Sequence, residues 1–325
     1  MKKKAASCAP PPKVPAPRNR TIRLLPGEQE FFESSFLSPS RKNWKLGEVT
    51  DRLIAGDLFK VIPHLPKGFV DLLILDPPYN LDKSFGKTRF SRMTTGAYFA
   101  YLDSFFPLLL PLLKKDASIY LCGDWQSSTA QSLLMEKYLI PRSRISWQRE
   151  KGRSSSKNWK NCCEDIWFGT VGKEYYFNAD AVKIKKRVIA PYRNADGDPK
   201  DWEETEEGRF RLTGSSNFWD DITIPYWSMP ENTPHPTQKP EKLLAKLILA
   251  SSREGGFILD PFVGSGTTCV VAKKLKRHFL GIDCNREYLA WGAKRLLLAE
   301  ENPLIQGYEE GVFYERNSGK QKKNR

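Results

Sequence analysis

Residues 256–283, GFILDPFVGSGTTCVVAKKLKRHFLGID, constrain the fold more than any other part of this chain. An apolar segment ends in Asp260, a glycine-rich turn and a helical stretch follow, and a second apolar segment ends in Asp283. The 23 residues from Asp260 to Asp283 fit one strand–helix–strand unit. Parallel strands of such a unit end at the same edge of the sheet, so we expect the two carboxylates to lie near each other there.

Other apolar segments of strand length alternate with helical patterns. Five further strands are expected, at 52–57, 70–76, 117–124, 143–150 and 164–171, and the last two read as a hairpin-like pair with a long loop. Helices are expected at 97–115, where Pro107 and Pro111 bend or restart the helix, at 239–252 and at 286–300. With the unit at 256–283, these segments favour an α/β fold with a parallel, doubly wound sheet.

Composition separates a folded part from two basic ends. Residues 1–46 are basic and Pro-rich and are expected to be disordered, and residues 316–325 form a basic tail with the same expectation. The folded domain is expected over 47–315. Within it, residues 183–234 lack convincing strand or helix periodicity. They read as an inserted, irregular segment, of the kind that carries recognition on a rigid scaffold.

The net charge of +14 lies mostly in the two ends. Residues 1–24 carry seven Lys or Arg and residues 316–325 carry five, with no acid in either stretch. A local cluster remains at 142–160, where seven basic residues stand around Trp147 and Trp159. Cations interleaved with aromatic rings suit phosphate contact and base stacking, although a solvated basic loop is the alternative. The candidates for phosphate contact are Lys151, Arg153, Lys157 and Lys160.

Two classes of protein are disfavoured by the sequence. No apolar run approaches the roughly 18 residues that span a bilayer, and residues 1–20 lack the apolar region of a signal peptide. We therefore expect no membrane partner and a cytoplasmic location. The six cysteines contain no CxxC pair, and the adjacent Cys162 and Cys163 cannot comfortably bind one metal ion, so we expect reduced thiols and no metal.

The glycine-rich turn predicts a ligand site. Gly264 and Gly266 let the backbone turn tightly and approach a ligand, and the next helix offers free N–H groups. A phosphate-binding P-loop would need a lysine that GSGTT lacks, and a dinucleotide motif would need glycine where Cys269 stands. S-adenosylmethionine is the third candidate, with an amino-acid end and a ribose but no phosphate. Asp260 would hold its ammonium and Asp283 its ribose hydroxyls; a helix cap is the alternative role for an acid at a strand end.

Three motifs together resemble a known family. They are DPPY at 76–79 after an expected strand, HPTQKP at 235–240 and DPFVGSGTT at 260–268. In this order the chain resembles the β class of DNA amino-methyltransferases, which includes restriction-modification and solitary adenine-N6 enzymes. The resemblance spans roughly residues 50–298. It implies a Rossmann-like α/β methyltransferase that depends on S-adenosylmethionine, with a doubly wound, mixed sheet of seven strands and a circularly permuted motif order. It also implies double-stranded DNA as partner, with a cognate restriction endonuclease and a homodimer as further possibilities.

The residues of DPPY suit an aromatic amine. The lone pair of adenine N6 is delocalised into the ring, and N6 is inaccessible inside a duplex, so the base must be flipped out and held. Asp76 would accept one N6–H and the carbonyl of Pro77 the other, which frees the lone pair. Pro77 and Pro78 fix the backbone, and Tyr79 offers a ring for stacking. We therefore predict that Asp76, Pro77, Pro78 and Tyr79 are catalytic.

The resemblance also implies the cofactor contacts. Asp57 would contact the adenine end of S-adenosylmethionine, HPTQKP would surround its methionine end, and Phe262 would wall the pocket. The alternatives are a helix cap for Asp57, plain core for Phe262 and an ordinary loop histidine at 235. Lys239 is a poor candidate for direct catalysis, because a protonated lysine would repel the sulfonium. The expected cofactor contacts are Asp57, Asp76, Thr237, Gln238, Lys239, Asp260, Phe262, Gly264, Ser265, Gly266, Thr267 and Asp283.

The expected activity is methyl transfer from S-adenosylmethionine to adenine N6 at a specific DNA sequence. Cytosine N4 is the alternative target, because the same clamp suits both amines. Family members that act on cytosine more often carry Ser in place of the first acid, so Asp76 favours adenine. A catalytically silent DNA-binding or specificity subunit is the alternative from another class. It is disfavoured because the DPPY and glycine-rich motifs are both intact.

Overall fold

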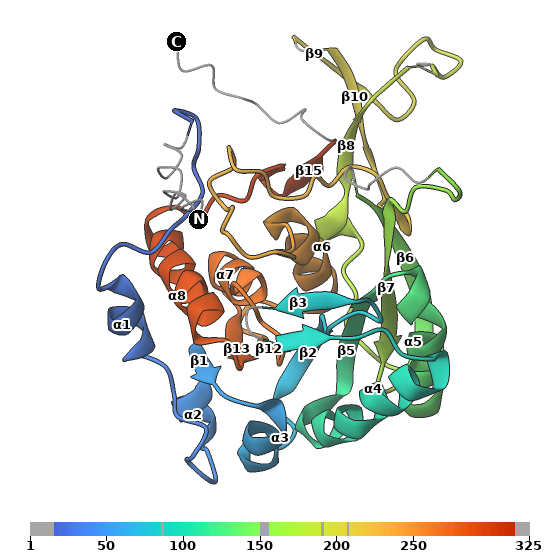
Figure 1. The fold of residues 1–325 in the computed structure, drawn as a ribbon. Coiled ribbons are helices and arrows are strands. Elements are labelled where there is room, and N and C mark those ends of the chain that lie inside the picture. Colours follow the sequence, from blue (N-terminus) through green and yellow to red (C-terminus); the bar gives the residue numbers. More distant parts are fainter. Residues whose placement is uncertain (1–15, 86–87, 150–155, 190–191, 207, 316–325) are drawn as a thin grey trace, which may run out of the picture.

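The computed structural model describes residues 16–85, 88–149, 156–189, 192–206 and 208–315, and its centre is a mixed sheet (Figure 1). The strand order is β1-β13-β12-β2-β5-β7-β6-β11. Neighbours from β1 to β5 in this order run parallel, and β7 runs antiparallel to both β5 and β6. The strands are β1 (Arg52–Ala55), β2 (Val70–Leu75), β5 (Leu113–Gly123), β6 (Ile140–Gln148), β7 (Cys163–Thr170), β11 (Phe218–Trp219), β12 (Phe257–Asp260) and β13 (His278–Asp283). All seven predicted strands are confirmed, and β11 adds a two-residue strand at the edge.

Strand β2 shows how the sheet is covered on both faces. Leu72 and Ile74 pack into one apolar core with α6, α7 and α8, whereas Leu73 and Leu75 pack into a second core with α3, α4 and α5 (Figure 1). A central parallel strand buried on both faces needs such a continuous apolar run. The helices are α3 (Leu58–Val61), α4 (Thr95–Leu109), α5 (Trp125–Tyr138), α6 (Glu241–Ser251), α7 (Thr267–Lys274) and α8 (Arg286–Glu301).

The predicted helix at 97–115 is shorter than expected. Helix α4 continues through Pro107 to Leu109, a 3₁₀ turn follows at η2 (Leu110–Leu112), and the chain then enters β5. Pro111 lies at the start of η2, where its missing N–H costs least. Leu113 pairs with Val70 of β2, so sheet pairing rather than local apolar density decides the last residues of this segment.

The prediction that residues 1–46 are disordered is wrong for residues 16–46, while residues 1–15 and 316–325 lie outside the described part. Residues 16–46 form α1 (Glu28–Glu33) and lead into α2 (Leu46–Val49). Phe32 and Trp44 are buried, and Glu28 forms an ion pair with Lys294 of α8, with Oε2 and Nζ 2.6 Å apart. The prediction of disorder was based on the Pro- and Lys-rich start of the chain and gave too little weight to the aromatic residues that follow it.

The segment 183–234, predicted to be irregular, contributes strands to a second sheet. Its order is β14-β15-β8-β10-β9, from β8 (Ile184–Arg187), β9 (Glu203–Thr205), β10 (Gly208–Thr213), β14 (Tyr308–Glu309) and β15 (Val312–Tyr314). Strands β9 and β10 project from the body (Figure 1). In β10 Phe210 and Leu212 alternate with Arg209 and Arg211, but Leu212 is 55% exposed, so neither face of the strand is buried.

Short elements complete the described chain. A two-stranded hairpin of β3 (Lys83–Phe85) and β4 (Thr88–Phe90) follows DPPY, and single 3₁₀ turns occur at η1 (Ile62–His64) and η3 (Asp180–Val182). Within the residues that the structure describes, no helix combines the length and the hydropathy that crossing a membrane requires.

Candidate active site

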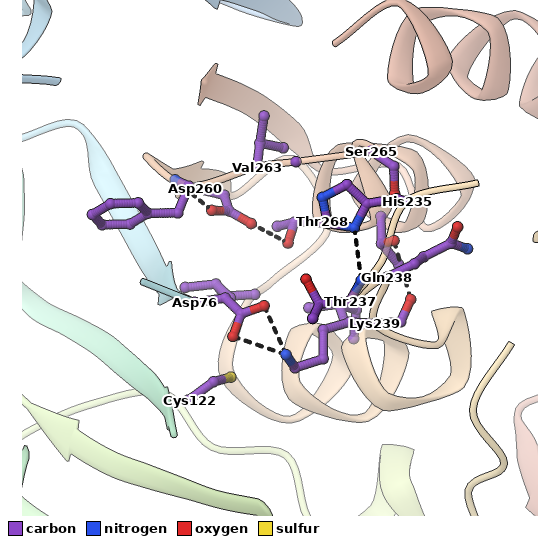
Figure 2. Close-up of a pocket in the computed structure, with 15 residues that line it drawn as sticks. Asp76, Cys122, His235, Thr237, Gln238, Lys239, Asp260, Val263, Ser265 and Thr268 are labelled. Atoms are coloured by element: carbon purple, nitrogen blue, oxygen red, sulfur yellow. Dashed lines mark hydrogen bonds and ion pairs between the residues drawn. The ribbon is translucent and has the colours of Figure 1, made fainter. Parts of the chain in front are cut away.

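The three sequence motifs meet at the carboxyl edge of the central sheet. Asp76 follows β2, Asp260 ends β12 and Asp283 ends β13, and these strands are neighbours in the order β13-β12-β2. HPTQKP lies across this edge just before α6, and Figure 2 shows Asp76, Lys239 and Asp260 around one cavity. The predicted position of Asp260 and Asp283 at one edge of the sheet is therefore confirmed, and Asp76 of DPPY lies at the same edge.

Two helices hold the DPPY backbone in place. The Tyr98 hydroxyl of α4 donates to the carbonyl oxygen of Pro78 at 3.0 Å. The next residue, Asn80, is buried, and its N–H donates to the Ser127 hydroxyl of α5 at 3.0 Å. Because both supports come from helices on the same face of the sheet, the tetrapeptide has little freedom to move.

Tyr79 directs its hydroxyl toward carboxylates. Its oxygen lies 3.0 Å from Asp76 Oδ1 and 3.0 Å from Glu164 Oε2. A hydroxyl has one hydrogen, so it donates to one of these acceptors at a time. Burial and the charges of Asp76 and Glu164 raise the pKa of Tyr79, which keeps the phenol protonated. The stacking role of its ring stays a prediction.

Lys239 contacts DPPY directly. Its Nζ donates to Asp76 Oδ1 at 2.8 Å and to Oδ2 at 2.7 Å, and Figure 2 shows both bonds. A third bond reaches the Tyr79 hydroxyl at 3.0 Å. Burial alone would lower the pKa of Lys239, but the Asp76 and Glu164 carboxylates raise it more, so the side chain stays charged. The sequence placed Lys239 with the cofactor and missed this pair.

Glu164 of β7 is a site residue that the sequence analysis missed. Its side chain is buried, forms an ion pair with Arg149 and lies 3.5 Å from Lys239 Nζ. Burial would raise its pKa, but the charges of Lys239 and Arg149 lower the net value below the usual range of a carboxyl. An acid within a strand normally indicates a solvent-facing position, so the sequence carried no signal for this one.

The glycine-rich turn requires its glycines and is braced by both strand-end acids. Gly264 and Gly266 have φ values of 52° and 79°, and a Cβ on Gly266 would lie 2.8 Å from Gly292 Cα of α8. Asp283 accepts from the N–H of Gly264 at 2.9 Å. Asp260 accepts from the Thr268 hydroxyl at 2.5 Å, and burial raises the pKa of Asp260 to about 7.

The HPTQKP segment is fixed to its surroundings. Gln238 Oε1 accepts from the Thr233 hydroxyl at 2.6 Å, and Gln238 Nε2 donates to the Glu231 carbonyl at 2.6 Å. His235 packs edge-on against Tyr288, and burial together with the Lys239 charge lowers the pKa of His235 to about 3. Gln238 thus anchors the loop, and His235 is neutral. Thr237, Gln238, Ser265 and Thr267 all line the cavity, and their contact with the cofactor stays a prediction.

Phe262 and Asp57 differ in their surroundings. Phe262 lines the cavity and packs against Phe105 with ring centroids 5.2 Å apart. Asp57 is exposed and accepts from the Phe59 N–H at 2.9 Å, so it caps α3, as its alternative role required. Gly56 donates to the Asp283 carbonyl at 2.9 Å, which places Asp57 beside the same sheet edge.

The polar side chains at this edge of the sheet suit S-adenosylmethionine better than a phosphate ligand. Asp76 and Asp260 supply carboxyl groups to the cavity, and Asp283 ends the neighbouring strand β13. The cation that lines the cavity, Lys239, is already paired with Asp76. Arg295 reaches the turn from behind, through the carbonyl oxygen of Ser265 at 3.0 Å, and is buried. Such a site suits an ammonium and hydroxyl groups, which donate hydrogen bonds to carboxylates.

Comparison with known sequences decides the family. The sequence model of a family described as DNA methylase matches residues 70–294. The chain belongs to this DNA methylase family. Among relatives of the DNA methylase, Type II methyltransferase M.HpaI of Haemophilus parainfluenzae is 32% identical over 248 residues, which are 75% of this chain and 74% of that protein. DNA adenine methyltransferase YhdJ of Escherichia coli strain K12 is 32% identical over 265 residues, which are 78% of this chain and 85% of that protein.

Solved structures support the fold of the DNA methylase. PvuII DNA methyltransferase, described as cytosine-N4-specific, superposes with a TM-score of 0.57 at 15% identity and covers 79% of this chain and 88% of its own. M1.HpyAVI in complex with S-adenosylmethionine has a TM-score of 0.51 at 20% identity and covers 75% of this chain and 98% of its own. The predicted Rossmann-like methyltransferase fold is confirmed, and the enzyme is a DNA methyltransferase that depends on S-adenosylmethionine.

The basic cluster of the DNA methylase divides into two groups. Three of its arginines have structural partners: Arg142 donates to the carbonyl of Lys173, Arg144 pairs with Asp165, and Arg149 pairs with Glu164. The four phosphate candidates lie in the loop between β6 and β7, which starts and ends at the carboxyl edge. Lys157 and Lys160 are exposed, and Lys151 and Arg153 lie outside the described residues.

Proposed function

We propose that this chain transfers the methyl group of S-adenosylmethionine to adenine N6 in a specific sequence of double-stranded DNA. The observation that carries the proposal is the position of Asp76, at the end of β2 and next to the glycine-rich turn after β12. An acceptor for an N–H therefore lies beside the site that suits the cofactor. The relative named DNA adenine methyltransferase YhdJ supports adenine as the target.

Asp76 would accept a hydrogen bond from the N6 amine of a flipped-out adenine, and the Pro77 carbonyl would accept the second. This pair of acceptors pulls the nitrogen toward tetrahedral geometry and frees its lone pair. Bound S-adenosylmethionine supplies an electrophilic methyl group. Asp283 would bind the ribose hydroxyls and Asp260 the ammonium, while Tyr98 and Ser127 hold the tetrapeptide in position through Pro78 and Asn80.

Cytosine N4 is the second candidate target, and the solved structure described as cytosine-N4-specific shares the fold. The fold therefore does not choose between the amines. The residue that favours adenine is Asp76, because relatives that act on cytosine more often have Ser at this position. Incubation of unmethylated plasmid with the protein and S-adenosylmethionine, followed by mass analysis of the nucleosides, separates the alternatives. N6-methyladenine supports the proposal, and N4-methylcytosine, or no product from folded protein that binds the cofactor, contradicts it.

The surface that binds DNA is proposed to include two segments. Lys151, Arg153, Lys157 and Lys160 would contact phosphates, because their loop leaves the sheet at the edge where Asp76 lies. Residues 183–234 would read bases, and the protruding strands β9 and β10 support this role (Figure 1). Replacing 186–234 with the matching segment of a relative of different specificity should change the methylated sequence. Methylation of the original sequence at full rate would contradict the proposal.

Three further predictions concern the setting of the enzyme. A cognate restriction endonuclease is proposed because the relative M.HpaI is named a Type II methyltransferase. A homodimer is proposed from the resemblance to the β class alone, and sedimentation of the purified chain by analytical ultracentrifugation tests it. A cytoplasmic location follows from the DNA substrate.

A further inference from the structure

The Lys239 ammonium occupies the place that the proposed mechanism assigns to the target amine. An ammonium has three N–H donors. All three are used, on Asp76 Oδ1, on Asp76 Oδ2 and on the Tyr79 hydroxyl. Lys239 takes one lone pair on each Asp76 oxygen and the Tyr79 hydroxyl lies 3.0 Å from Oδ1, so about one of the four acceptor positions of the carboxylate is left for an adenine N6–H.

The space beside Asp76 is also too small for a base. The cavity lined by Asp76, Lys239 and Asp260 has a volume of about 30 Å³. This is room for about one or two water molecules. The same cavity is lined by the expected cofactor contacts, so the site must widen for cofactor and base alike, and Lys239 is the side chain bonded to Asp76.

A buried charge that leaves its partner needs another one, because breaking a buried ion pair without compensation is strongly unfavourable. Glu164 is placed to receive Lys239. Its Oε2 lies 3.5 Å from Lys239 Nζ, just beyond hydrogen-bond length, and its side chain is 7% exposed. The Tyr79 hydroxyl lies 3.0 Å from both carboxylates, so its single hydrogen can turn to whichever one Lys239 leaves.

Arg149 holds the Glu164 carboxylate, the proposed second partner of Lys239. It pairs with Glu164 and lies at the end of β6, so the Glu164 carboxylate stays charged and fixed. Asp76, Glu164, Lys239 and Arg149 have the same total charge in both positions of the lysine, and Lys83 is a further cation close to these four groups. Moving Lys239 from Asp76 to Glu164 changes no net charge in the site.

We propose that Lys239 takes the place of the target amine on Asp76 in the free enzyme and withdraws to Glu164 when the flipped base enters. The inference rests on the proposed role of Asp76 as acceptor for that amine. Lys239 and Glu164 are then positioning residues: one keeps the acceptor paired until the base arrives, and the other receives the displaced charge.

The test compares Glu164→Gln, Lys239→Met and the double variant in single-turnover methylation at saturating cofactor and DNA. Glu164→Gln removes the anion that receives Lys239, so the rate should fall about tenfold or more, while the dissociation constants for cofactor and DNA stay within about twofold. In the double variant no lysine competes for Asp76. Its rate should therefore be several-fold higher than that of Glu164→Gln, although it carries one more substitution.

Glu164→Asp keeps the charge and is the conservative control, so its loss should be smaller than that of Glu164→Gln. Thermal melting of each variant ensures that rates are compared at equal folded fractions. A double variant as slow as Glu164→Gln, or slower, contradicts the proposal, and so does equal loss in Glu164→Asp and Glu164→Gln. Nucleoside analysis of the wild-type product tests the proposed function separately, because the base that is methylated does not depend on how the variants rank.

Discussion

The hydroxyl of Thr267 donates a hydrogen bond to the backbone carbonyl oxygen of Lys239 at 3.1 Å. The first helical residue after the glycine-rich turn is therefore bonded directly to HPTQKP. The side chain of the same lysine is bonded to Asp76 of DPPY. The three motifs that are far apart in the sequence thus meet at one residue, and a change in one of them is expected to affect the others.

Asp76→Ala should abolish methyl transfer while cofactor affinity stays largely intact. A charge-assisted acceptor at the reacting nitrogen contributes at least roughly 3 kcal/mol, or more than a hundredfold in rate. Single-turnover rates and calorimetric cofactor titration measure the two effects. Asp103→Ala, which removes a surface ion pair with Lys137, is the control for loss of an acid. A variant that keeps more than about a tenth of the wild-type rate would refute the clamp.

Asp283→Ala should weaken cofactor binding by about 1.5–3 kcal/mol, the range for a charged group that accepts hydrogen bonds. Turnover at saturating cofactor should fall less than affinity. The structure adds a second cause, since the variant also loses the bond to the Gly264 N–H that braces the turn. Calorimetry on the folded variant measures the effect, and unchanged affinity would remove Asp283 from the cofactor site.

Asp57→Asn separates the two roles of Asp57. Asparagine caps helices about as well as aspartate, so the stability of the variant should match the wild type, whereas Asp57→Ala should lose about 1 kcal/mol. If Asp57 contacts the cofactor through its charge, both variants should bind S-adenosylmethionine more weakly. Denaturant unfolding and cofactor titration give the two readings. Wild-type affinity in both variants would leave Asp57 as a helix cap alone.

Asp260 should make the cofactor-free protein less stable at high pH. Its folded pKa of about 7 lies above the value of about 3.9 for an unfolded chain, so the folded state binds the extra proton between these values. That stabilisation is complete below about pH 4 and is lost as the pH rises through about 7. Asp260→Asn cannot ionise, so its melting temperature relative to the wild type should be higher at pH 8 than at pH 5. A difference that does not change with pH would contradict the assignment.

Neutralising Lys151, Arg153, Lys157 and Lys160 together should weaken binding to all DNA sequences alike. The slope of log affinity against log salt should fall by about 0.9 for each phosphate that the variant no longer neutralises. The matched control neutralises Lys67, Lys115, Lys173 and Lys276, which are exposed near the opposite edge of the sheet. A quadruple loop variant that keeps the wild-type salt slope would show that the loop does not contact phosphates.

The central sheet could be predicted because its strands are continuous apolar runs, and an acidic residue or a turn marks where each run ends. Asp260 and Asp283 were predicted to lie at one edge because parallel strands of such a unit end together. The hairpin of β9 and β10 was harder to predict, because the alternation of Phe210 and Leu212 with arginines covers only four residues and neither face of the ribbon is buried. Strand β15 of the same sheet comes from the far end of the chain.

Side-chain contacts across the site were harder to predict than its backbone. The Lys239–Asp76 pair joins residues 163 positions apart, and no local pattern marks it. Glu164 lies in a strand beside Asp165 and Trp167, which are both half-buried, and nothing in the sequence distinguishes Glu164 from these neighbours. Its burial follows from the docking of Arg149 and Tyr79, which only the folded chain brings together.

Single-molecule sequencing of genomic DNA from a host that expresses this chain tests the account most directly, because it reports the modified base and its sequence context together. The account predicts N6-methyladenine at one recurring sequence, present with the wild-type chain and absent with Asp76→Ala. N4-methylcytosine at such a sequence, or no modified base although the expressed chain is folded and binds S-adenosylmethionine, would contradict it.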